Sequence, residues 1–336
     1  MAALTLAGPS DGDKCESDQI LMVPIIQNDT KEWIWDYLNL DAPISRWYDE
    51  WCQRDPIFAK HAKRFAGVSI LRQDPWECMC ASNNNIPRIS QMVHKLSDHF
   101  TEPVLDHTYP PGSYLCTSMD PEEDRPPDTE NEPLHVRYHP FPTPSQLAEP
   151  GVEQKLRSFG FGYRAKYLAG TAQSLCALAT KSLATDDIKP VRVDQAVYDY
   201  LLSLRSMTYA DARQVLLQLP GVGPKVADCI LLMSLDQYSS IPVDRHVFQF
   251  AERWYRIRSK KYEDIADRLR EIWGKRAGWA HTVLFYADLP SFDRYDGTKI
   301  QSDKATDVLS YKRERSPEDE LAAPARDVKL RVPHRS

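Results

Sequence analysis

Apolar residues recur at helical spacing along most of this 336-residue chain, and that spacing limits the folds open to it. The apolar positions within residues 168–179, 212–219, 247–254 and 265–273 each fall on one face of a helix. The chain has no comparable series of alternating apolar and polar residues, which is the pattern of half-buried strands. The sequence therefore predicts an all-α, multi-helix domain.

The helical pattern also extends toward the N-terminus. We expect helices near residues 31–40 and 44–65, as parts of an N-terminal helical region at 31–100 that packs on the later helices. The main core is expected at residues 134–290. The polar stretch 291–336 predicts a disordered tail.

Between these two helical regions, residues 101–133 predict an acidic, Pro-rich, disordered insertion, because they can bury little apolar surface. Residues 101–150 carry ten Asp and Glu against two Arg, a local charge of −8. Residues 151–300 carry 22 Lys and Arg against 17 Asp and Glu, a local charge of +5. The whole-chain charge of −6 argues against a polyanionic partner, but its distribution leaves a basic segment that can face nucleic acid.

The seven cysteines are scattered and form no C-x-x-C pair. This spacing predicts free thiols, with neither a disulfide framework nor a zinc or iron–sulfur site. No residue pattern indicates a cofactor. We see no targeting signal and no apolar run long enough to span a bilayer, so we expect a soluble intracellular protein outside the membrane.

A glycine-containing turn, Leu219-Pro-Gly-Val-Gly-Pro-Lys225, lies between two of the predicted helices. Two glycines separated by one residue allow a tight turn with exposed backbone N–H groups, and Pro224 suits the first turn of the next helix. Such N–H groups at a helix N-terminus bind phosphate, which makes Gly221 and Gly223 candidate phosphate-binding residues. A purely structural helix hairpin is the alternative interpretation.

Lys225 lies in the first turn of the helix that follows the glycines. There the positive end of the helix dipole disfavours an ammonium group, and a neutral amine can attack an electrophilic carbon and form a Schiff base. Val226 and Ile230 share an apolar face that we expect in the core. We therefore expect Lys225, Asp228 and Cys229 to point away from that core.

Asp244 ends the segment Ile241-Pro-Val-Asp244 and precedes another predicted helix. An ordinary helix N-cap is one interpretation of this residue. The other is a carboxylate in the same site as Lys225, able to stabilise a cationic transition state or to move a proton. The residue pattern alone leaves both interpretations open.

The turn ending at Lys225, together with Pro242-Val-Asp244, resembles the helix-hairpin-helix, Gly/Pro…Asp superfamily of DNA repair glycosylases. A lysine after the hairpin, followed by Val-Ala-Asp-Cys, is similar to eukaryotic 8-oxoguanine DNA glycosylases with AP-lyase activity. Further segments similar to that family are Leu71-Arg-Gln-Asp-Pro75, Ser82-Asn-Asn-Asn-Ile86, Gly160-Phe-Gly-Tyr-Arg-Ala-Lys-Tyr167 and Gly278-Trp-Ala-His-Thr-Val-Leu-Phe-Tyr-Ala-Asp-Leu289. The resemblance covers residues 31–100 and 134–290, without the cysteine ligands of the iron–sulfur relatives.

This resemblance implies a base-excision-repair enzyme without a metal or other cofactor. Its substrate would be double-stranded DNA containing 8-oxoguanine opposite cytosine, or an abasic site. Lys225 would displace the base at C1′ and remain as a Schiff base during β-elimination, while Asp244 would stabilise the oxocarbenium-like sugar. The DNA-binding and base-binding residues implied by the resemblance are Asn83, Arg88, Tyr163, Arg164, Gly221, Gly223, Cys229, His246, His281 and Phe285.

Four of these residues are expected at the opened base pair. Asn83 would fill the gap left by the flipped nucleotide, and Tyr163 would wedge into the stack. Arg88 and Arg164 would read the orphaned cytosine, since flipping leaves an unpaired base. Taken singly, each residue has a plain alternative: a capped turn for Asn83, surface charge for the arginines and core packing for Tyr163.

The remaining side chains are expected around the phosphate and the extruded base. His246 and the hairpin amides would hold phosphate. Cys229, Phe285 and His281 would line the base pocket. His281 is a departure, because relatives often have Gln there.

Two segments depart from the family pattern. Residues 1–30 contain no match to its N-terminal β-rich subdomain, which we therefore expect to be truncated or absent. The segment Trp76–Ser82 is about four residues shorter than in relatives, close to one helical turn.

We expect a monomeric glycosylase and AP lyase in the nucleus, with mitochondria as a second location. The alternative is a lyase-only or non-catalytic helix-hairpin-helix DNA-binding protein.

Overall fold

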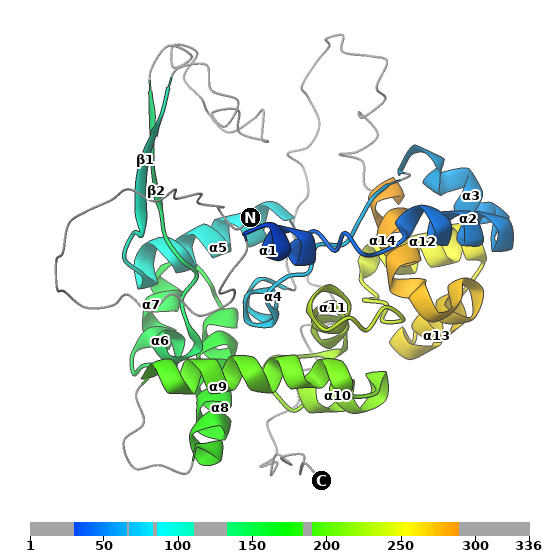
Figure 1. Cartoon of the computed structure of the whole chain (residues 1–336). Coiled ribbons are helices and arrows are strands. Elements are labelled where there is room, and N and C mark those ends of the chain that lie inside the picture. Colours follow the sequence, from blue (N-terminus) through cyan, green and yellow to red (C-terminus); the bar gives the residue numbers. More distant parts are fainter. Residues whose placement is uncertain (1–29, 66, 83–85, 111–132, 184–189, 289–336) are drawn as a thin grey trace. The chain divides into compact units, whose positions relative to one another are not determined.

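The structure is a computed structural model, and it describes residues 30–65, 67–82, 86–110, 133–183 and 190–288 (Figure 1). The chain divides into two compact units. The middle unit holds residues 80–200, and the hairpin unit combines residues 28–79 with the chain from residue 201 onward. All regular elements of the described residues except two strands are helices, which confirms the predicted all-α class. None of the described helices is both long and apolar enough to cross a membrane.

The hairpin unit begins with the helices predicted for the N-terminal region. They are α1 (Thr30–Tyr37), α2 (Ile44–Arg54), α3 (Pro56–Ala62) and the 3-10 turn η1 (Lys63–Phe65). The later helices of this unit are η4 (Leu204–Ser206), α10 (Tyr209–Leu216), α11 (Pro224–Ser234), α12 (Arg245–Tyr255), α13 (Tyr262–Trp273), η5 (Gly274–Arg276) and α14 (Ala277–Asp288).

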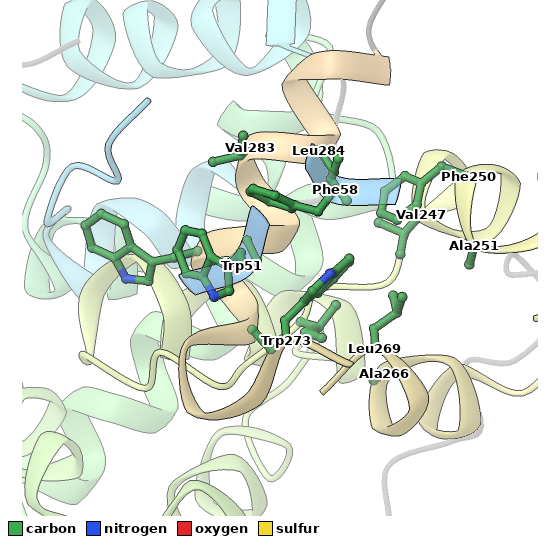
Figure 2. Packing of buried hydrophobic residues seen from close by; sticks show 14 of the residues in the cluster. Trp51, Phe58, Val247, Phe250, Ala251, Ala266, Leu269, Trp273, Val283 and Leu284 are labelled. Carbon is green, nitrogen blue, oxygen red and sulfur yellow. The ribbon is translucent and has the colours of Figure 1, made fainter. Parts of the chain in front are cut away.

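The apolar core of the hairpin unit lies among α2, α3, α12, α13 and α14, and Figure 2 shows part of it. Trp51, Phe58, Phe250 and Trp273 are each at most 2% exposed. Burial of one large apolar side chain stabilises a fold by roughly 1.5–3 kcal/mol. This packing fixes α12 and α14, the two helices that carry several of the candidate site residues.

A buried carboxylate ties these helices together. Asp55 Oδ2 accepts hydrogen bonds from the Tyr255 hydroxyl at 2.6 Å and the Trp273 indole at 2.9 Å. The other oxygen, Oδ1, accepts from the backbone N–H of Ile57 at 2.9 Å and so caps α3. Asp55 is 4% exposed, and these three donors compensate its burial.

The middle unit contains α5 (Ile86–Phe100), β1 (Leu105–Tyr109), β2 (Leu134–Tyr138), α6 (Pro144–Ala148), α7 (Val152–Ser158), α8 (Arg164–Ser182) and α9 (Pro190–Ser203). Helices α6 and α7 both pack on α8. The face of α8 predicted to be apolar is buried at Leu168, Ala172, Leu175 and Ala179. Its periodicity is therefore confirmed.

The two strands are a departure from the sequence prediction. β1 pairs antiparallel with β2, with Leu105 opposite Tyr138 and Tyr109 opposite Leu134. The prediction of disorder over 101–133 is therefore wrong for Leu105–Tyr109. The acidic run dominates the composition of that stretch and obscures a short segment with the strand-favouring residues Thr and Tyr. Residues 111–132, 291–336 and 1–29 lie outside the described residues.

The segment predicted to be shorter than in relatives forms helix α4 (Pro75–Ala81). Asp74 Oδ1 accepts hydrogen bonds from the backbone N–H groups of Trp76 at 2.8 Å and Glu77 at 2.9 Å, which caps the helix start. Trp76, Cys78 and Met79 are each at most 5% exposed. The short helix therefore still buries an apolar face.

Candidate functional site

The predicted helix hairpin joins α10 to α11. Gly221 has a φ of 75°, a left-handed conformation that favours glycine. Gly223 is extended, with φ −89°, and precedes Pro224 at the first position of α11. Gly221 is exposed and Gly223 half-buried. The turn therefore presents its backbone beside a helix N-terminus, as an anion-binding hairpin requires.

Lys225 follows directly in the first turn of α11 and is half-buried. Val226 and Ile230 are buried, which confirms the predicted core face. Cys229 lies one turn after Lys225, and its thiol is within hydrogen-bonding reach of the lysine amine. Burial raises the pKa of the Cys229 thiol, with Lys225 acting in the opposite direction. The two side chains thus share one side of α11.

Asp228 does not share that side, and the prediction that it points away from the core is wrong. Its residue exposure is 0%. The Tyr209 hydroxyl donates to Asp228 Oδ1 at 2.7 Å, and the Ser240 hydroxyl donates to the same oxygen at 2.8 Å. The carboxylate is buried because other elements of the unit supply donors for it.

Asp244 is the N-cap of α12. Its Oδ1 accepts a hydrogen bond from the backbone N–H of Val247 at 2.9 Å. The residue is half-buried, and its charge acts on two neighbours: it adds to the burial that raises the pKa of the Cys229 thiol, and it opposes the burial that lowers the pKa of the His281 imidazole. Capping is therefore confirmed, and it does not exclude the second interpretation, because the carboxylate also acts on the cluster around Lys225.

His281 lies on α14 and is 5% exposed. Its ring centroid is 6.0 Å from that of Phe285 and 6.3 Å from that of Phe250. Neither ring nitrogen meets full hydrogen-bond geometry with a described residue, although the backbone of Gly278 lies close enough to act on the pKa of the ring. Burial lowers the pKa of His281 to about 4, against the opposing charge of Asp244, so the imidazole is neutral at pH 7. A neutral imidazole can both donate and accept a hydrogen bond to a ligand.

His246 lies beside this cluster, in the first turn of α12. Its ring meets the Phe285 ring edge-on, with 5.8 Å between centroids. Its Nδ1 is 4.0 Å from Asp288 Oδ2, and its side chain is 40% exposed. An exposed imidazole at the N-terminal end of a helix is compatible with the predicted phosphate contact.

The candidate residues of the middle unit form a second group. Tyr163 is 59% exposed at the start of α8. Arg164 is 9% exposed, and its guanidinium donates to the carbonyl oxygens of Cys80, at 2.8 Å, and Ser82. Arg88 is exposed and donates to the Gly160 carbonyl oxygen at 2.7 Å. Asn83 lies outside the described residues.

The structure thus brings together the predicted residues of the hairpin unit, namely Gly221, Gly223, Lys225, Cys229, Asp244, His246, His281 and Phe285. Tyr163, Arg88 and Arg164 belong to the middle unit. An amine, a carboxylate and a neutral imidazole in one cluster can perform nucleophilic attack and proton transfer. No group of metal ligands occurs among the residues that the structure describes.

The residue pattern does not reveal the partners of Asp228, which include Tyr209, Ser240 and Tyr262. They come from separate elements, and no periodicity relates them. One signal was present: a carboxylate within the apolar helix 226–233 needs buried partners, because unpaired Asp is almost never fully buried.

Two family descriptions match the sequence. Residues 16–79 match the N-terminal domain of 8-oxoguanine DNA glycosylase, and residues 78–275 match the HhH-GPD superfamily of base excision DNA repair proteins. The first match includes residues 16–30, so the prediction that residues 1–30 contain no match to the N-terminal subdomain is wrong for these residues.

Individual relatives agree with these matches. The chain is 36% identical to the N-glycosylase/DNA lyase OGG1 of Arabidopsis thaliana over 76% of this chain and 61% of the relative. It is 33% identical to the N-glycosylase/DNA lyase of Saccharomyces cerevisiae over 78% of this chain and 68% of the relative. A solved structure of Clostridium acetobutylicum 8-oxoguanine glycosylase/lyase, bound to DNA with cytosine opposite 8-oxoguanine, matches with a TM-score of 0.56 and 26% identity. That match covers 76% of this chain and 73% of the other.

Proposed function

Because this chain belongs to the HhH-GPD superfamily of base excision DNA repair proteins, we propose that it is a bifunctional DNA glycosylase and AP lyase. Its substrate is 8-oxoguanine opposite cytosine in double-stranded DNA. The observation that carries the proposal is the cluster in which Lys225 lies in the first turn of α11 after the glycine turn, and in which Lys225 and Asp244 are both close enough to His281 for their charges to act on its pKa. The names and substrates of the relatives support the same activity.

In the proposed reaction, the neutral amine of Lys225 attacks C1′ of the damaged nucleotide. The C1′–N bond to the base breaks, and the base leaves with its bonding electron pair and takes up one proton of the attacking nitrogen. The C1′–O4′ ring bond of the resulting amino sugar then breaks, O4′ takes up a proton, and the nitrogen loses its second proton as the open-chain Schiff base forms. Loss of a proton from C2′ then expels the 3′ phosphate, which completes β-elimination. The reaction is redox-neutral and uses only groups that the chain supplies.

Asp244 has a separate role in this proposal. Positive charge develops on the sugar as the base departs, and a half-buried carboxylate stabilises that charge more strongly than bulk water does. Its hydrogen bond with Val247 holds Oδ1, so the carboxylate is oriented before the substrate arrives. Preorganised charge of this kind contributes to rate because it needs no rearrangement during the reaction.

The proposed partner is the DNA duplex, bound by the monomeric protein. The hairpin amides at Gly221 and Gly223, with His246, would bind the phosphate backbone. Exposed Tyr163 would enter the opened base step. The base itself would lie against Cys229, His281 and Phe285. Nuclear location stays a prediction, which imaging of the tagged chain in cells tests.

Borohydride trapping tests the proposed function directly, because it reduces a lysine Schiff base to a stable covalent adduct. We would incubate the full chain with duplexes containing 8-oxoguanine, guanine or an abasic site opposite cytosine. An adduct with 8-oxoguanine and not with guanine supports the proposal. Adducts only at the abasic site would indicate a lyase-only protein, and no adduct on any duplex would exclude both activities.

Two lysine variants assign the nucleophile. Lys225→Gln removes the amine and is expected to abolish the adduct. The affinity for the duplex is expected to stay within about threefold of wild type, since the substitution removes only one charged group. Lys275→Gln removes an exposed lysine of η5 and serves as the matched control. Trapping by Lys225→Gln at the wild-type level would overturn the assignment of Lys225.

A further inference from the structure

The Asp228 carboxylate gathers donors from several elements of the hairpin unit. Besides Tyr209 and Ser240, the Tyr262 hydroxyl donates to Oδ2 at 2.7 Å and the Arg213 guanidinium donates to the same oxygen at 3.3 Å. Arg213 also pairs with Glu263 at 2.7 Å. A fully buried charge with this many donors is a rigid point of the structure, because each lost donor leaves a costly unpaired group.

One of these donors connects Asp228 to the segment that carries Asp244. The backbone N–H of Val243, the residue directly before Asp244, donates to the Tyr262 hydroxyl at 3.2 Å. Tyr262 has one hydroxyl proton, and the short contact to Asp228 takes it. The phenol oxygen can then accept from the Val243 N–H, so Val243 donates to Tyr262 and Tyr262 donates to Asp228.

Burial and the charge of Asp228 raise the pKa of the Tyr262 phenol, so the hydroxyl keeps its proton throughout the working pH range. The Ser240 hydroxyl, on the same connecting segment, also lies 3.0 Å from the backbone oxygen of Asp228, so its one proton is shared between that oxygen and Oδ1. Residues 235–244 form neither helix nor strand, so their path depends on such contacts. Asp228 of α11 therefore holds the segment between α11 and α12 at two points, directly at Ser240 and through Tyr262 at Val243.

We propose that Asp228 and Tyr262 position Asp244 relative to Lys225 for base excision. The inference rests on the proposed function. Asp228 lies three residues after Lys225 on α11. Tyr262 hydrogen-bonds both Asp228 and the backbone of Val243, so it connects the helix that carries Lys225 to the residue before Asp244. Neither residue touches the substrate in this scheme. Misplacing a reacting group by about 1 Å can cost about a hundredfold in rate, so a positioning pair of this kind affects catalysis.

The competing interpretation is that the pair only stabilises the fold. The chain offers a matched control, because the Tyr255 hydroxyl donates to the buried carboxylate of Asp55 at 2.6 Å in the same unit. Tyr255→Phe and Tyr262→Phe each remove one hydroxyl from a buried Tyr–Asp pair. Only Tyr262 also accepts the backbone N–H next to Asp244.

The first measurement is amide hydrogen exchange of the full-length variants, which needs no activity. Tyr262→Phe is expected to speed exchange at Val243 by about fivefold or more, the factor that corresponds to one lost hydrogen bond. Tyr255→Phe is expected to leave exchange at Val243 unchanged. Equal exchange at Val243 in wild type and Tyr262→Phe would overturn the inference whether or not the chain excises bases.

The second measurement is single-turnover excision of 8-oxoguanine, normalised to the folded fraction. Tyr262→Phe is expected to be slowed about 10- to 100-fold, and Tyr255→Phe to stay within about twofold. Trapping at a preformed abasic site, which needs Lys225 but no base departure, is expected to stay within about threefold in both variants. Equal slowing of excision by the two variants would overturn the inference.

A double-mutant cycle links the effect to Asp244. In an Asp244→Asn background, Tyr262→Phe is expected to slow excision by less than about twofold, because its effect acts through the carboxylate already removed. Fully additive effects would overturn the inference. A wild-type chain that excises nothing would overturn the proposed function, while the exchange comparison would still decide whether Tyr262 holds the segment at Val243.

Discussion

Asp244 accepts a hydrogen bond from the backbone N–H of Val247 at 2.9 Å, so one carboxylate both caps α12 and belongs to the cluster around Lys225. The two roles can be separated by substitution. Asn is as good an N-cap as Asp, whereas Ala cannot cap. Asp244→Asn is therefore expected to leave the free energy of unfolding within about 0.5 kcal/mol, while Asp244→Ala loses about 1 kcal/mol.

Both Asp244 variants are expected to slow base excision by about a hundredfold, because each removes the charge that stabilises the sugar cation. Urea denaturation and single-turnover excision measure the two effects. If Asp244→Asn excised 8-oxoguanine at the wild-type rate, Asp244 would be a cap and nothing more.

The thiol of Cys229 gives a second prediction. Burial raises its pKa, so it is protonated at pH 7.5 and a weak nucleophile. Iodoacetamide is expected to modify Cys229 at least about tenfold more slowly than a cysteine in an unstructured peptide. Lys225→Gln is expected to slow the reaction further, because the lysine lowers the thiol pKa. Mass spectrometry of the peptide containing Cys229 measures the rate, and modification as fast as in the free peptide would contradict the prediction.

The helices could be predicted because their apolar positions repeat. The buried faces at Leu168–Ala179 and at Val226 and Ile230 lie where the spacing places them. Asp228 could not be placed this way. A face argument assumes that buried positions are apolar, and the hydroxyl groups that make a buried carboxylate possible come from Tyr209 and Tyr262, on other helices.

The site was predicted unevenly for a similar reason. The hairpin, Lys225 and Asp244 lie within a short stretch of sequence, so their spacing carries the information. Arg164 was expected to read the orphaned cytosine, and this role stays a prediction; its guanidinium donates to two backbone oxygens near the end of α4, which the sequence did not indicate. The sequence places a guanidinium at the start of a helix, but which carbonyls it reaches depends on tertiary packing.

The two hairpin glycines are expected to respond differently to alanine. Gly221 has a φ of 75°, so a Cβ there strains the backbone, and Gly221→Ala is expected to cost about 1–2 kcal/mol of stability. Gly223 is extended, and a Cβ built there meets no described atom within 4 Å, so Gly223→Ala is expected to be neutral within about 0.5 kcal/mol. Thermal unfolding of both variants measures the difference. Equal losses would show that the turn does not require a left-handed residue at 221.

Substitutions at Tyr163 and Phe161, near the start of α8, are expected to separate the effect of a DNA contact from the effect of core packing. Tyr163 is 59% exposed and Phe161 is 3% exposed. Tyr163→Ala is expected to leave the free energy of unfolding within about 0.5 kcal/mol of wild type. It is expected to weaken binding of the lesion duplex about tenfold, because stacking of one base on an aromatic ring contributes about 1–3 kcal/mol to binding. Phe161→Ala is expected to cost about 3–5 kcal/mol of stability. Unchanged duplex affinity in folded Tyr163→Ala would remove this residue from the proposed interface.

The lowered pKa of His281 predicts that the free energy of unfolding depends on pH. Its pKa is lowered from 6.5 to about 4 by burial, so between these values the unfolded chain binds a proton that the folded chain does not. The contribution of His281 is fully present above pH 6.5 and is lost progressively as the pH falls to about 4, by up to about 3 kcal/mol. His281→Gln keeps a polar side chain but no titrating group, so it is expected to lack this loss.

Comparison of wild type with His281→Gln isolates the effect from other titrating groups. Burial raises the pKa of Glu77 to about 7, which gives the opposite slope in the same pH range, but this contribution is common to both proteins and cancels in the difference. Urea denaturation at pH 7.5 and pH 4.5 measures the free energy of unfolding of each protein. His281→Gln is expected to gain stability relative to wild type as the pH falls, and a difference that stays constant between the two pH values would contradict the buried, neutral imidazole.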